Sequence, residues 1–159
     1  MLKAGDPAPN FTVSGDDGRP VSLADLRGRI VVLYFYPKAN TSGCACEAGE
    51  FRDFQKEFTK LGAVVLGCSA DQIDAQARFK KKEHLNFTLL SDPDFVVIEN
   101  YGARRMKKFL GKSFLGIVRS TVLIGPDGKI LKVWETAHAK GHAAEVLEAV
   151  RALQAAAKG

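Results

Sequence analysis

One stretch, from Ile30 to Leu61, places the strongest constraint on how this chain can fold. It opens with seven apolar residues, Ile30 to Tyr36, which indicate a buried strand. Pro37 ends that strand, because proline has no N–H to donate to a neighbouring strand. Further on, apolar residues recur at helical spacing from Phe51 to Leu61, which predicts one helix. The stretch therefore reads as a core strand, a short polar loop and a helix.

A cysteine falls at the start of this helix. With Thr41 as the N-cap, Cys44 is the third helical residue, among backbone N–H groups that lack helical partners. These donors and the positive end of the helix dipole favour a thiolate over a thiol. A free cysteine is often a small buried hydrophobic residue instead, but loops between a strand and a helix are usually exposed. We therefore expect Cys44 to be exposed and reactive.

The order of the predicted elements indicates an α/β fold. Strands and helices alternate and are followed by a hairpin and a closing helix, which describes a mixed central sheet covered by helices on both faces. The turn residues Gly15 to Gly18 predict a hairpin extension at the N-terminus. We expect residues 1–159 to form a single domain.

Chain topology also predicts where a site would lie. The second core strand is Ala63 to Cys68, and right-handed crossovers bring the loops after parallel strands to the same edge of the sheet. Open α/β sheets bind their ligands at that edge. Cys44 follows the first core strand directly, so we expect it at this edge.

The formal net charge of +5 raises the question of nucleic-acid or membrane partners. Acidic and basic residues are interleaved through most of the chain, and the one cationic cluster runs from Arg104 to Lys112. We interpret this cluster as a solvated loop, with an anion-binding patch as the alternative. It lacks notable aromatic interleaving, so we expect no nucleic-acid partner, and no membrane partner either.

Cellular location is predicted from the cysteines and from the N-terminal residues. No apolar run reaches the 18 residues of a membrane span, and the segment from Met1 to Pro7 has no signal-peptide core. Three cysteines do not make a disulfide framework. We expect a cytoplasmic protein in which any disulfide is transient and catalytic.

Two motifs resemble those of a known family. The segment Pro37 to Cys44 resembles the Pro-x-x-x-Thr-x-x-Cys active-site motif of peroxiredoxins, and Arg119, at the opening of a late strand, resembles their second signature. The resemblance runs from about Gly5 to Leu153 and implies a thioredoxin-like fold. Further segments are similar to the peroxiredoxin Q branch, also called bacterioferritin comigratory protein: Phe35–Lys38, Glu47–Ala48, Leu90–Asp92 and Gly116–Thr121.

This resemblance implies a peroxidase that reduces hydrogen peroxide and alkyl hydroperoxides without metal, flavin or other cofactor. Cys44 matches the peroxidatic nucleophile, which attacks the peroxide as a thiolate and becomes a sulfenic acid. Thr41 would hydrogen-bond the thiolate and the peroxide, and Arg119 would stabilise their negative charge. Pro37 would shield the sulfur from water. Glu47 is expected to pair with a cation such as Arg119, or else to be an ordinary acid near a helix N-terminus.

The chain departs from many members of this branch at the resolving cysteine. That cysteine would lie five residues after Cys44, where this sequence has Gly49, or in the next helix, where the segment from Gln72 to Leu85 has no cysteine. Cys46 lies about 200° from Cys44 around the helix, so a disulfide between them would require unwinding. Cys68, at the end of the adjacent core strand, is expected to be a buried core thiol. The alternative is that it approaches Cys44 from below and resolves it.

We therefore expect a one-cysteine mechanism in which thioredoxin or another external thiol reduces the sulfenic acid. Cys46 is the alternative resolving cysteine. The branch also leads us to expect a monomer.

Two other functions use the same residues. A thiol–disulfide oxidoreductase on this fold would need Cys-x-x-Cys, and Cys44 and Cys46 have the wrong spacing. A metal-binding module could use these two cysteines with His138 and His142, but the pattern matches no standard zinc arrangement. We expect both histidines to be exposed to solvent.

Overall fold

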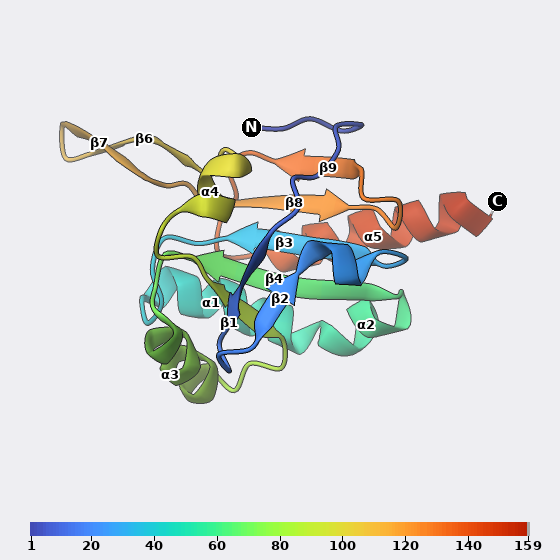
Figure 1. Ribbon diagram of the computed structural model, residues 1–159, viewed down its shortest axis with the longest axis horizontal. Coiled ribbons are helices and arrows are strands. Elements are labelled where there is room, and N and C mark those ends of the chain that lie inside the picture. Colours follow the sequence, from blue (N-terminus) through green and yellow to red (C-terminus); the bar gives the residue numbers. More distant parts are fainter. Residues whose placement is uncertain (159) are drawn as a thin grey trace.

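The computed structural model describes residues 1–158 as a seven-stranded sheet with helices on both faces and a separate two-stranded hairpin (Figure 1). The order of the strands in the sheet is β2-β1-β5-β4-β3-β8-β9. These strands are β1 (Thr12–Gly15), β2 (Pro20–Ser22), β3 (Ile30–Phe35), β4 (Ala63–Ser69), β5 (Thr88–Ser91), β8 (Ser120–Ile124) and β9 (Ile130–Trp134). The separate hairpin consists of β6 (Arg104–Phe109) and β7 (Lys112–Ile117). The helices are α1 (Ser42–Asp53), α2 (Gln55–Lys60), α3 (Ile73–Glu83), α4 (Val96–Asn100), α5 (His142–Lys158) and a 3-10 turn, η1 (Leu23–Leu26).

The centre of the sheet is parallel and its edges are antiparallel. Strands β3, β4 and β5 run parallel to one another, whereas β8 is antiparallel to β3 and β9 is antiparallel to β8. All six residues of β3 are buried, because helices cover both faces of the sheet at this strand. The predicted mixed sheet, the N-terminal hairpin β1–β2 and the hairpin β8–β9 are all confirmed.

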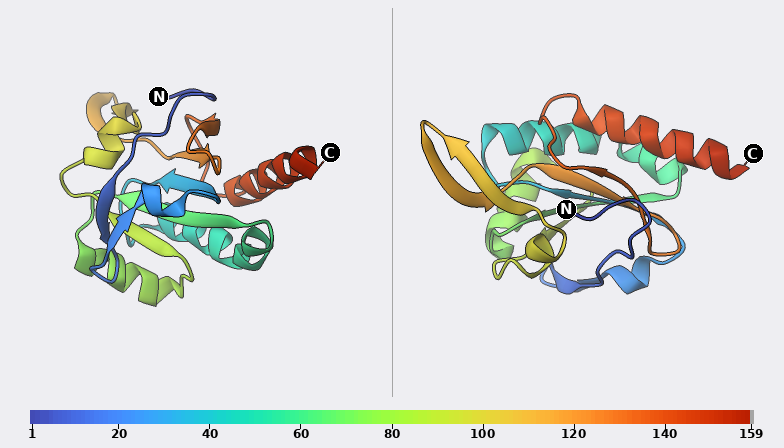
Figure 2. Two further views of the ribbon diagram at one scale, coloured as in Figure 1. Left: turned by 45° about the vertical axis from the view of Figure 1, so that its right-hand side comes forward. Right: turned by 90° about the horizontal axis from the view of Figure 1, so that it is seen from above.

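Alternating side chains of β3 build two separate cores, one on each face of the sheet. Val32 and Tyr34 belong to the core under α1, α2, α3 and α5, whereas Leu33 and Phe35 belong to the core under α4, η1 and the N-terminal segment. The right view of Figure 2 shows α1, α2 and α5 above the sheet and α4 and η1 below it. Among the described residues, no helix combines the length and apolar character that a membrane crossing requires.

The helix predicted to run without a break to Leu61 is instead two helices. Phe54 lies between α1 and α2, with φ −98° and ψ 6°, outside helical values. In an unbroken helix the Arg52 carbonyl would accept from Lys56 N–H four residues on. Here Asn86 Nδ2 donates to that carbonyl over 3.3 Å. A side chain from the loop before β5 thus bonds to this carbonyl where the helix breaks.

The cationic segment from Arg104 to Lys112 is a β-strand and a turn, so its prediction as a solvated loop is wrong. Strands β6 and β7 pair in a continuous antiparallel register from Arg104↔Ile117 to Phe109↔Lys112. The hairpin projects away from the body of the molecule in Figure 1 and in the right view of Figure 2. Its two strands pair with each other and not with the central sheet.

A close contact between neighbouring central strands fixes one glycine. Gly67 of β4 lies opposite Tyr34 of β3, and a Cβ at Gly67 would lie 2.9 Å from the tyrosine ring. The ring cannot move aside, because it is fully buried and stacked on Phe51 with 4.6 Å between ring centroids. Only glycine therefore fits at this position without a shift of the core.

We expect Gly67→Ala to lower the free energy of unfolding by about 2 kcal/mol, because the added methyl overpacks the Tyr34–Phe51 stack. Urea denaturation followed by circular dichroism measures the change. Gly49→Ala in α1 is the matched control. The nearest atoms to an added Cβ there belong to the Arg52 side chain, at 3.5 Å, and alanine in a helix is favoured by up to about 1 kcal/mol. If Gly67→Ala is as stable as wild type, the close contact between position 67 and the Tyr34 ring is contradicted.

Candidate active site

The loop between β3 and α1 places Cys44 at the sheet edge predicted for it. Helix α1 begins at Ser42, so Cys44 is its third residue, and Ala45 N–H already donates to the Thr41 carbonyl over 2.9 Å. The side chain is not exposed as expected. Cys44 has 1% of its surface accessible and belongs to the core under α1. The thiol therefore lies inside the protein, at the N-terminal end of a helix.

Arg119 comes from the other half of the chain and contacts this thiol. It directly precedes β8, whose first residue, Ser120, pairs with Phe35 at the end of β3. Its guanidinium Nη2 donates to Cys44 Sγ over 3.4 Å, and Nη1 donates to Glu47 Oε1 over 2.7 Å. One planar side chain thus holds a thiol and a carboxylate that lie on successive turns of α1. The expected pairing of Glu47 with Arg119 is present.

Glu47 is a carboxyl group buried without full compensation. Its side chain is completely inaccessible, and Oε2 has no hydrogen-bond partner among residues 1–158. Desolvation raises the pKa of Glu47 to about 7, although the charge of Arg119 works in the opposite direction. Burial alone would lower the pKa of Arg119, but Glu47 and Cys44 outweigh it, so the pKa of Arg119 is raised. The guanidinium therefore stays charged.

Thr41 occupies the N-cap position in extended conformation, with φ −104° and ψ 153°. Its hydroxyl makes no capping bond to the described part of the helix, and donates instead to the Lys38 carbonyl over 2.7 Å. Thr41 therefore occupies the predicted N-cap position, but its side chain does not make the capping hydrogen bond. Because the single O–H is taken by Lys38, the oxygen lone pairs of Thr41 are left to accept a hydrogen bond.

The loop before Cys44 is anchored by a residue that sequence reasoning missed. Asp71, just after β4, accepts from Ala39 N–H over 2.8 Å and from the Ser69 hydroxyl over 2.6 Å. Pro37, at the other end of this loop, is half-buried and lines a cavity of about 280 Å³ together with Lys107 and Phe114. Asp71 follows a parallel core strand at the same sheet edge as Cys44. That place in the sequence was the signal that could have identified it.

Neither of the other cysteines faces Cys44. Cys46 is exposed, and its Sγ lies 3.8 Å from Glu50 Oε2 on the outer side of α1. Cys68 is fully buried in the core on the opposite face of the sheet, as expected of a core thiol. Desolvation there raises the pKa of Cys68 well above its ordinary value. In the folded chain, Cys44 has no second thiol directed toward it among the described residues.

The histidines do not gather around the cysteines. His138 is exposed, as expected, but His142 is buried and lies 2.7 Å from the Thr121 hydroxyl through Nε2. Burial lowers the pKa of His142. Within residues 1–158, no three His, Cys, Asp or Glu side chains lie close enough together to hold a metal ion. The residues of the metal-binding alternative are therefore spread over separate places.

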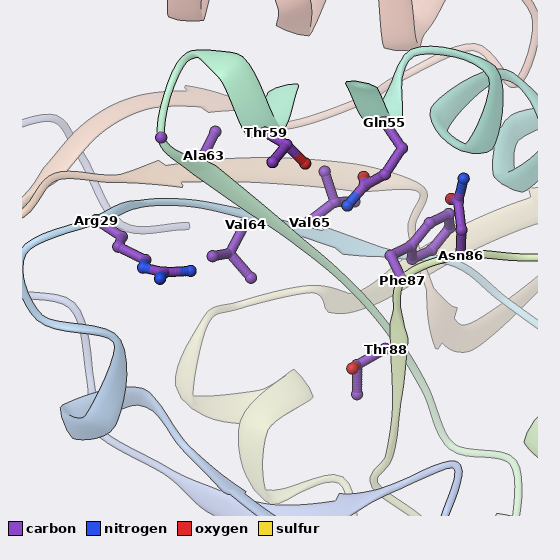
Figure 3. Close-up of a pocket in the computed structure, with 10 residues that line it drawn as sticks. Arg29, Gln55, Thr59, Ala63, Val64, Val65, Asn86, Phe87 and Thr88 are labelled. Carbon is purple, nitrogen blue, oxygen red and sulfur yellow. The ribbon is translucent and has the colours of Figure 1, made fainter. Parts of the chain in front are cut away.

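A larger cavity, of about 430 Å³, lies at the opposite end of the sheet (Figure 3). It is lined at the beginnings of the central strands by residues such as Arg29, Ala63 and Thr88, with Gln55 from α2. No cysteine lines it. Cys44 and Arg119 lie at the other edge of the sheet, where β3 ends.

The burial of Glu47 predicts a pH dependence of stability. Between pH 4.5 and about 7, folded Glu47 keeps a proton that the unfolded chain releases, so the free energy of unfolding falls as pH rises through this window. At about 1.4 kcal/mol per pH unit, wild type should lose of order 3 kcal/mol relative to Glu47→Gln between pH 4.5 and 8. Urea denaturation of both proteins across this range measures it.

The matched control is Glu148→Gln, since the Glu148 side chain is exposed. Its stability should follow that of wild type at every pH. A constant difference between wild type and Glu47→Gln from pH 4.5 to 8 would show that Glu47 titrates normally in the folded state.

Comparisons with known sequences show the family of this chain. The sequence profile of the AhpC/TSA family matches residues 4–133. The "Putative peroxiredoxin bcp" of Coxiella burnetii is 47% identical over 146 residues, which cover 92% of this chain and 97% of that protein. "Peroxiredoxin Bcp" of Escherichia coli K12 is 47% identical over 141 residues, which cover 89% of this chain and 90% of the relative.

Solved structures give the same result. The bacterioferritin comigratory protein of Xanthomonas campestris superposes with a TM-score of 0.87 at 35% identity, covering 91% of this chain and 92% of that one. A cysteine-to-serine mutant of PrxQ from Xylella fastidiosa superposes with a TM-score of 0.91 at 33% identity, covering 96% and 97% of the two chains. The expected thioredoxin-like peroxiredoxin fold is confirmed. The chain belongs to the AhpC/TSA family, in its peroxiredoxin Q branch, and is a thiol-dependent peroxidase.

Proposed function

We propose that Cys44 is the peroxidatic nucleophile and that Arg119, held by Glu47, stabilises the negative charge of the reaction. One observation carries this assignment: the Arg119 guanidinium lies 3.4 Å from Cys44 Sγ and 2.7 Å from Glu47 Oε1. A fixed cation beside the sulfur stabilises both the thiolate and the charge that develops on the peroxide oxygens. Because the second bond to Glu47 holds the guanidinium plane, this cation is already in place before a peroxide binds.

The oxidation of Cys44 involves only the chain and the peroxide, and an external thiol completes the cycle. The Cys44 thiolate attacks the terminal oxygen of the hydroperoxide, so an S–O bond forms as the O–O bond breaks. The leaving oxygen takes a proton and departs as water or an alcohol, and the sulfur is left as a sulfenic acid. Two equivalents of an external thiol then reduce the sulfenic acid, releasing water and a disulfide.

Thr41 and Pro37 fit positioning roles around the sulfur. Because Thr41 gives its only O–H to the Lys38 carbonyl, its oxygen is free to accept the O–H of an incoming hydroperoxide. That bond would direct the terminal oxygen of the peroxide toward the start of α1. Pro37 has no N–H with which to hold a water molecule, and it is half-buried, which supports its proposed role in keeping water from the thiol.

The substrates are peroxides, and we propose that they include organic hydroperoxides as well as hydrogen peroxide. The cavity of about 280 Å³ beside Pro37 supports this extension, because Phe114, Leu115 and Ile117 give it an apolar lining that suits an alkyl chain. The bacterioferritin comigratory protein of Xanthomonas campestris is described as having alkyl peroxide reduction activity. No cofactor enters this proposal.

The reductant is a thiol, and we propose thioredoxin or a similar dithiol protein, acting on a cytoplasmic monomer. Cys44 is almost inaccessible in the folded chain, so the first turn of α1 must open locally before a protein thiol reaches the oxidised sulfur. Cys46 lies in the same turn of α1. It is the only candidate for an internal partner that such an opening would move together with Cys44.

Kinetic variants test the assignment of Cys44 and Arg119. We expect Cys44→Ser to abolish peroxide reduction and Arg119→Met to lower kcat/KM by about 10²–10³, the usual effect of losing one charge-stabilising donor. The kcat/KM of Arg119→Lys should lie between those of Arg119→Met and wild type, since lysine keeps the positive charge but lacks the two-pronged guanidinium. Arg29→Met, at the opposite end of the sheet, is the control and should match wild type. Peroxidase activity that survives Cys44→Ser would overturn the site.

Mass spectrometry without reductant tests the one-cysteine mechanism. After one equivalent of peroxide, we expect the major product to be a sulfenic acid at Cys44 that dimedone traps, because Cys46 and Cys68 face away from it. Cys46→Ser should then turn over like wild type. A Cys44–Cys46 disulfide as the major product would instead make Cys46 the resolving cysteine.

Gly49→Cys serves as the positive control of that experiment. It places a thiol five residues after Cys44, where many members of the branch carry their resolving cysteine. The added Cβ would have only the Arg52 side chain near it, at 3.5 Å, so the variant should fold. We expect this variant to form the intramolecular disulfide that wild type does not form.

A further inference from the structure

The projecting hairpin β6–β7 carries an unusual concentration of exposed apolar side chains. Met106 is 64% exposed, Phe109 is 67% exposed and Leu110, at the tip, is 86% exposed. Phe114 and Leu115 of the return strand are also exposed. An isolated two-stranded hairpin is marginally stable in water, so this much free apolar surface indicates a partner.

The apolar side chains lie on both faces of the ribbon. Directly paired residues share a face of the ribbon. Met106 and its partner Leu115 therefore lie on one face, whereas Phe109 and Phe114 lie on the other. A folded protein that docked against one face would leave the other face in water. A fluid apolar medium into which the tip inserts would cover both faces at once.

The tip itself has a strained backbone. Leu110 and Gly111 form a two-residue turn between Phe109 and Lys112, with φ of 51° and 77°. Such turns favour asparagine or glycine at the first position, because other L-residues pay a steric cost at positive φ. A leucine that is both strained and fully in water contributes nothing to the stability of the isolated chain. Its presence points to a role outside the fold.

Positive charge surrounds this apolar tip. From Asn100 to Pro126 the sequence contains no acidic residue. Two cations at the base of the hairpin are engaged, Arg104 with Glu99 and Arg105 with the Glu135 carbonyl. Lys108 and Lys112 at the tip are exposed, and neither forms an ion pair within the described chain. The free charge is therefore concentrated beside Phe109 and Leu110.

We propose that the β6–β7 hairpin docks this peroxidase on an anionic lipid bilayer, with Phe109 and Leu110 inserted among the acyl chains and Lys108 and Lys112 on the headgroups. Apolar insertion flanked by lysines is the chemistry of peripheral membrane binding. The charge of the tip complements anionic lipid, and its two apolar faces suit a bilayer better than a flat protein surface. This replaces the sequence-based expectation of no membrane partner.

The β6–β7 hairpin is directly connected to the candidate active site. Val118 N–H donates to the Ala103 carbonyl over 2.8 Å and closes the base of the hairpin, and Arg119 follows at once. Lys107 and Phe114 of the hairpin line the cavity that Pro37 also lines. A chain docked in this way presents that cavity to the bilayer surface.

Vesicle binding of the full chain tests this proposal without any turnover, so its result is independent of the peroxidase mechanism. We expect wild type to sediment with vesicles of phosphatidylcholine and phosphatidylserine, to bind phosphatidylcholine alone far more weakly, and to be released by salt. Leu110→Asn should bind at least about ten-fold more weakly. Lys108→Gln with Lys112→Gln should bind roughly 25-fold more weakly, at about five-fold for each lysine.

These variants are chosen to leave the fold and the site intact. Leu110→Asn creates an Asn-Gly turn, which suits the observed φ values, so its stability in urea should equal or exceed that of wild type. Matched controls on α3 are Ile73→Asn, which removes another exposed apolar side chain, and Lys81→Gln with Lys82→Gln, which removes the same charge. All of these proteins should reduce hydrogen peroxide in solution like wild type, and both controls should bind vesicles like wild type.

Three outcomes would overturn the proposal. The first is wild type that fails to bind phosphatidylserine vesicles, or binds them no better than Leu110→Asn does. The second is a wild-type dimer in sedimentation velocity that Leu110→Asn converts to a monomer, which would assign the tip to a second copy of the chain. The third is a KM for thioredoxin that rises in the lysine variants while vesicle binding is absent, which would assign the hairpin to an acidic protein.

Discussion

The bond of one guanidinium to both a buried carboxylate and a buried thiol is the interaction on which the rest of this structure depends. Arg119 enters from β8, whereas Glu47 and Cys44 belong to α1, so the pair joins the two halves of the chain across the end of β3. Glu47 is fully buried and its pKa is raised to about 7, and the fixed cation of Arg119 stabilises its ionised form. The position of Arg119 beside the sulfur therefore depends on how β3, β8 and α1 pack at this edge of the sheet.

Local signals were sufficient to predict the parts of the site that lie close together in sequence. The apolar run before Pro37 and the helix after Thr41 placed Cys44 correctly, because strand end, loop and helix start each have a residue signature. Arg119 has no local signal and was found only through resemblance to a family. Asp71 was missed, since its bond to Ala39 N–H depends on how two loops meet in space.

The errors share a physical cause, which is tertiary contact overriding a local pattern. Cys44 was expected to be exposed, but the guanidinium of Arg119 and the core under α1 enclose it. The helical pattern ending at Leu61 breaks at Phe54, where Asn86 partners a helix carbonyl. His142 looked like a solvent-facing residue and is buried against Thr121. The cationic segment from Arg104 is a strand because it pairs with β7, a partner that its own composition does not predict.

Under the proposed one-cysteine mechanism, the lack of a second thiol directed at Cys44 among the described residues determines how the enzyme responds to an excess of peroxide. A neighbouring cysteine would capture the sulfenic acid quickly and protect it as a disulfide. Under that mechanism, the lifetime of the oxidised sulfur depends on the concentration of an external thiol, and a second peroxide molecule competes with the thiol for the sulfur. Further oxidation gives a sulfinic acid, which thiols do not reverse. On this proposal, the fraction of enzyme that escapes further oxidation reports the local ratio of peroxide to reductant, because position 49 holds glycine instead of a resolving cysteine.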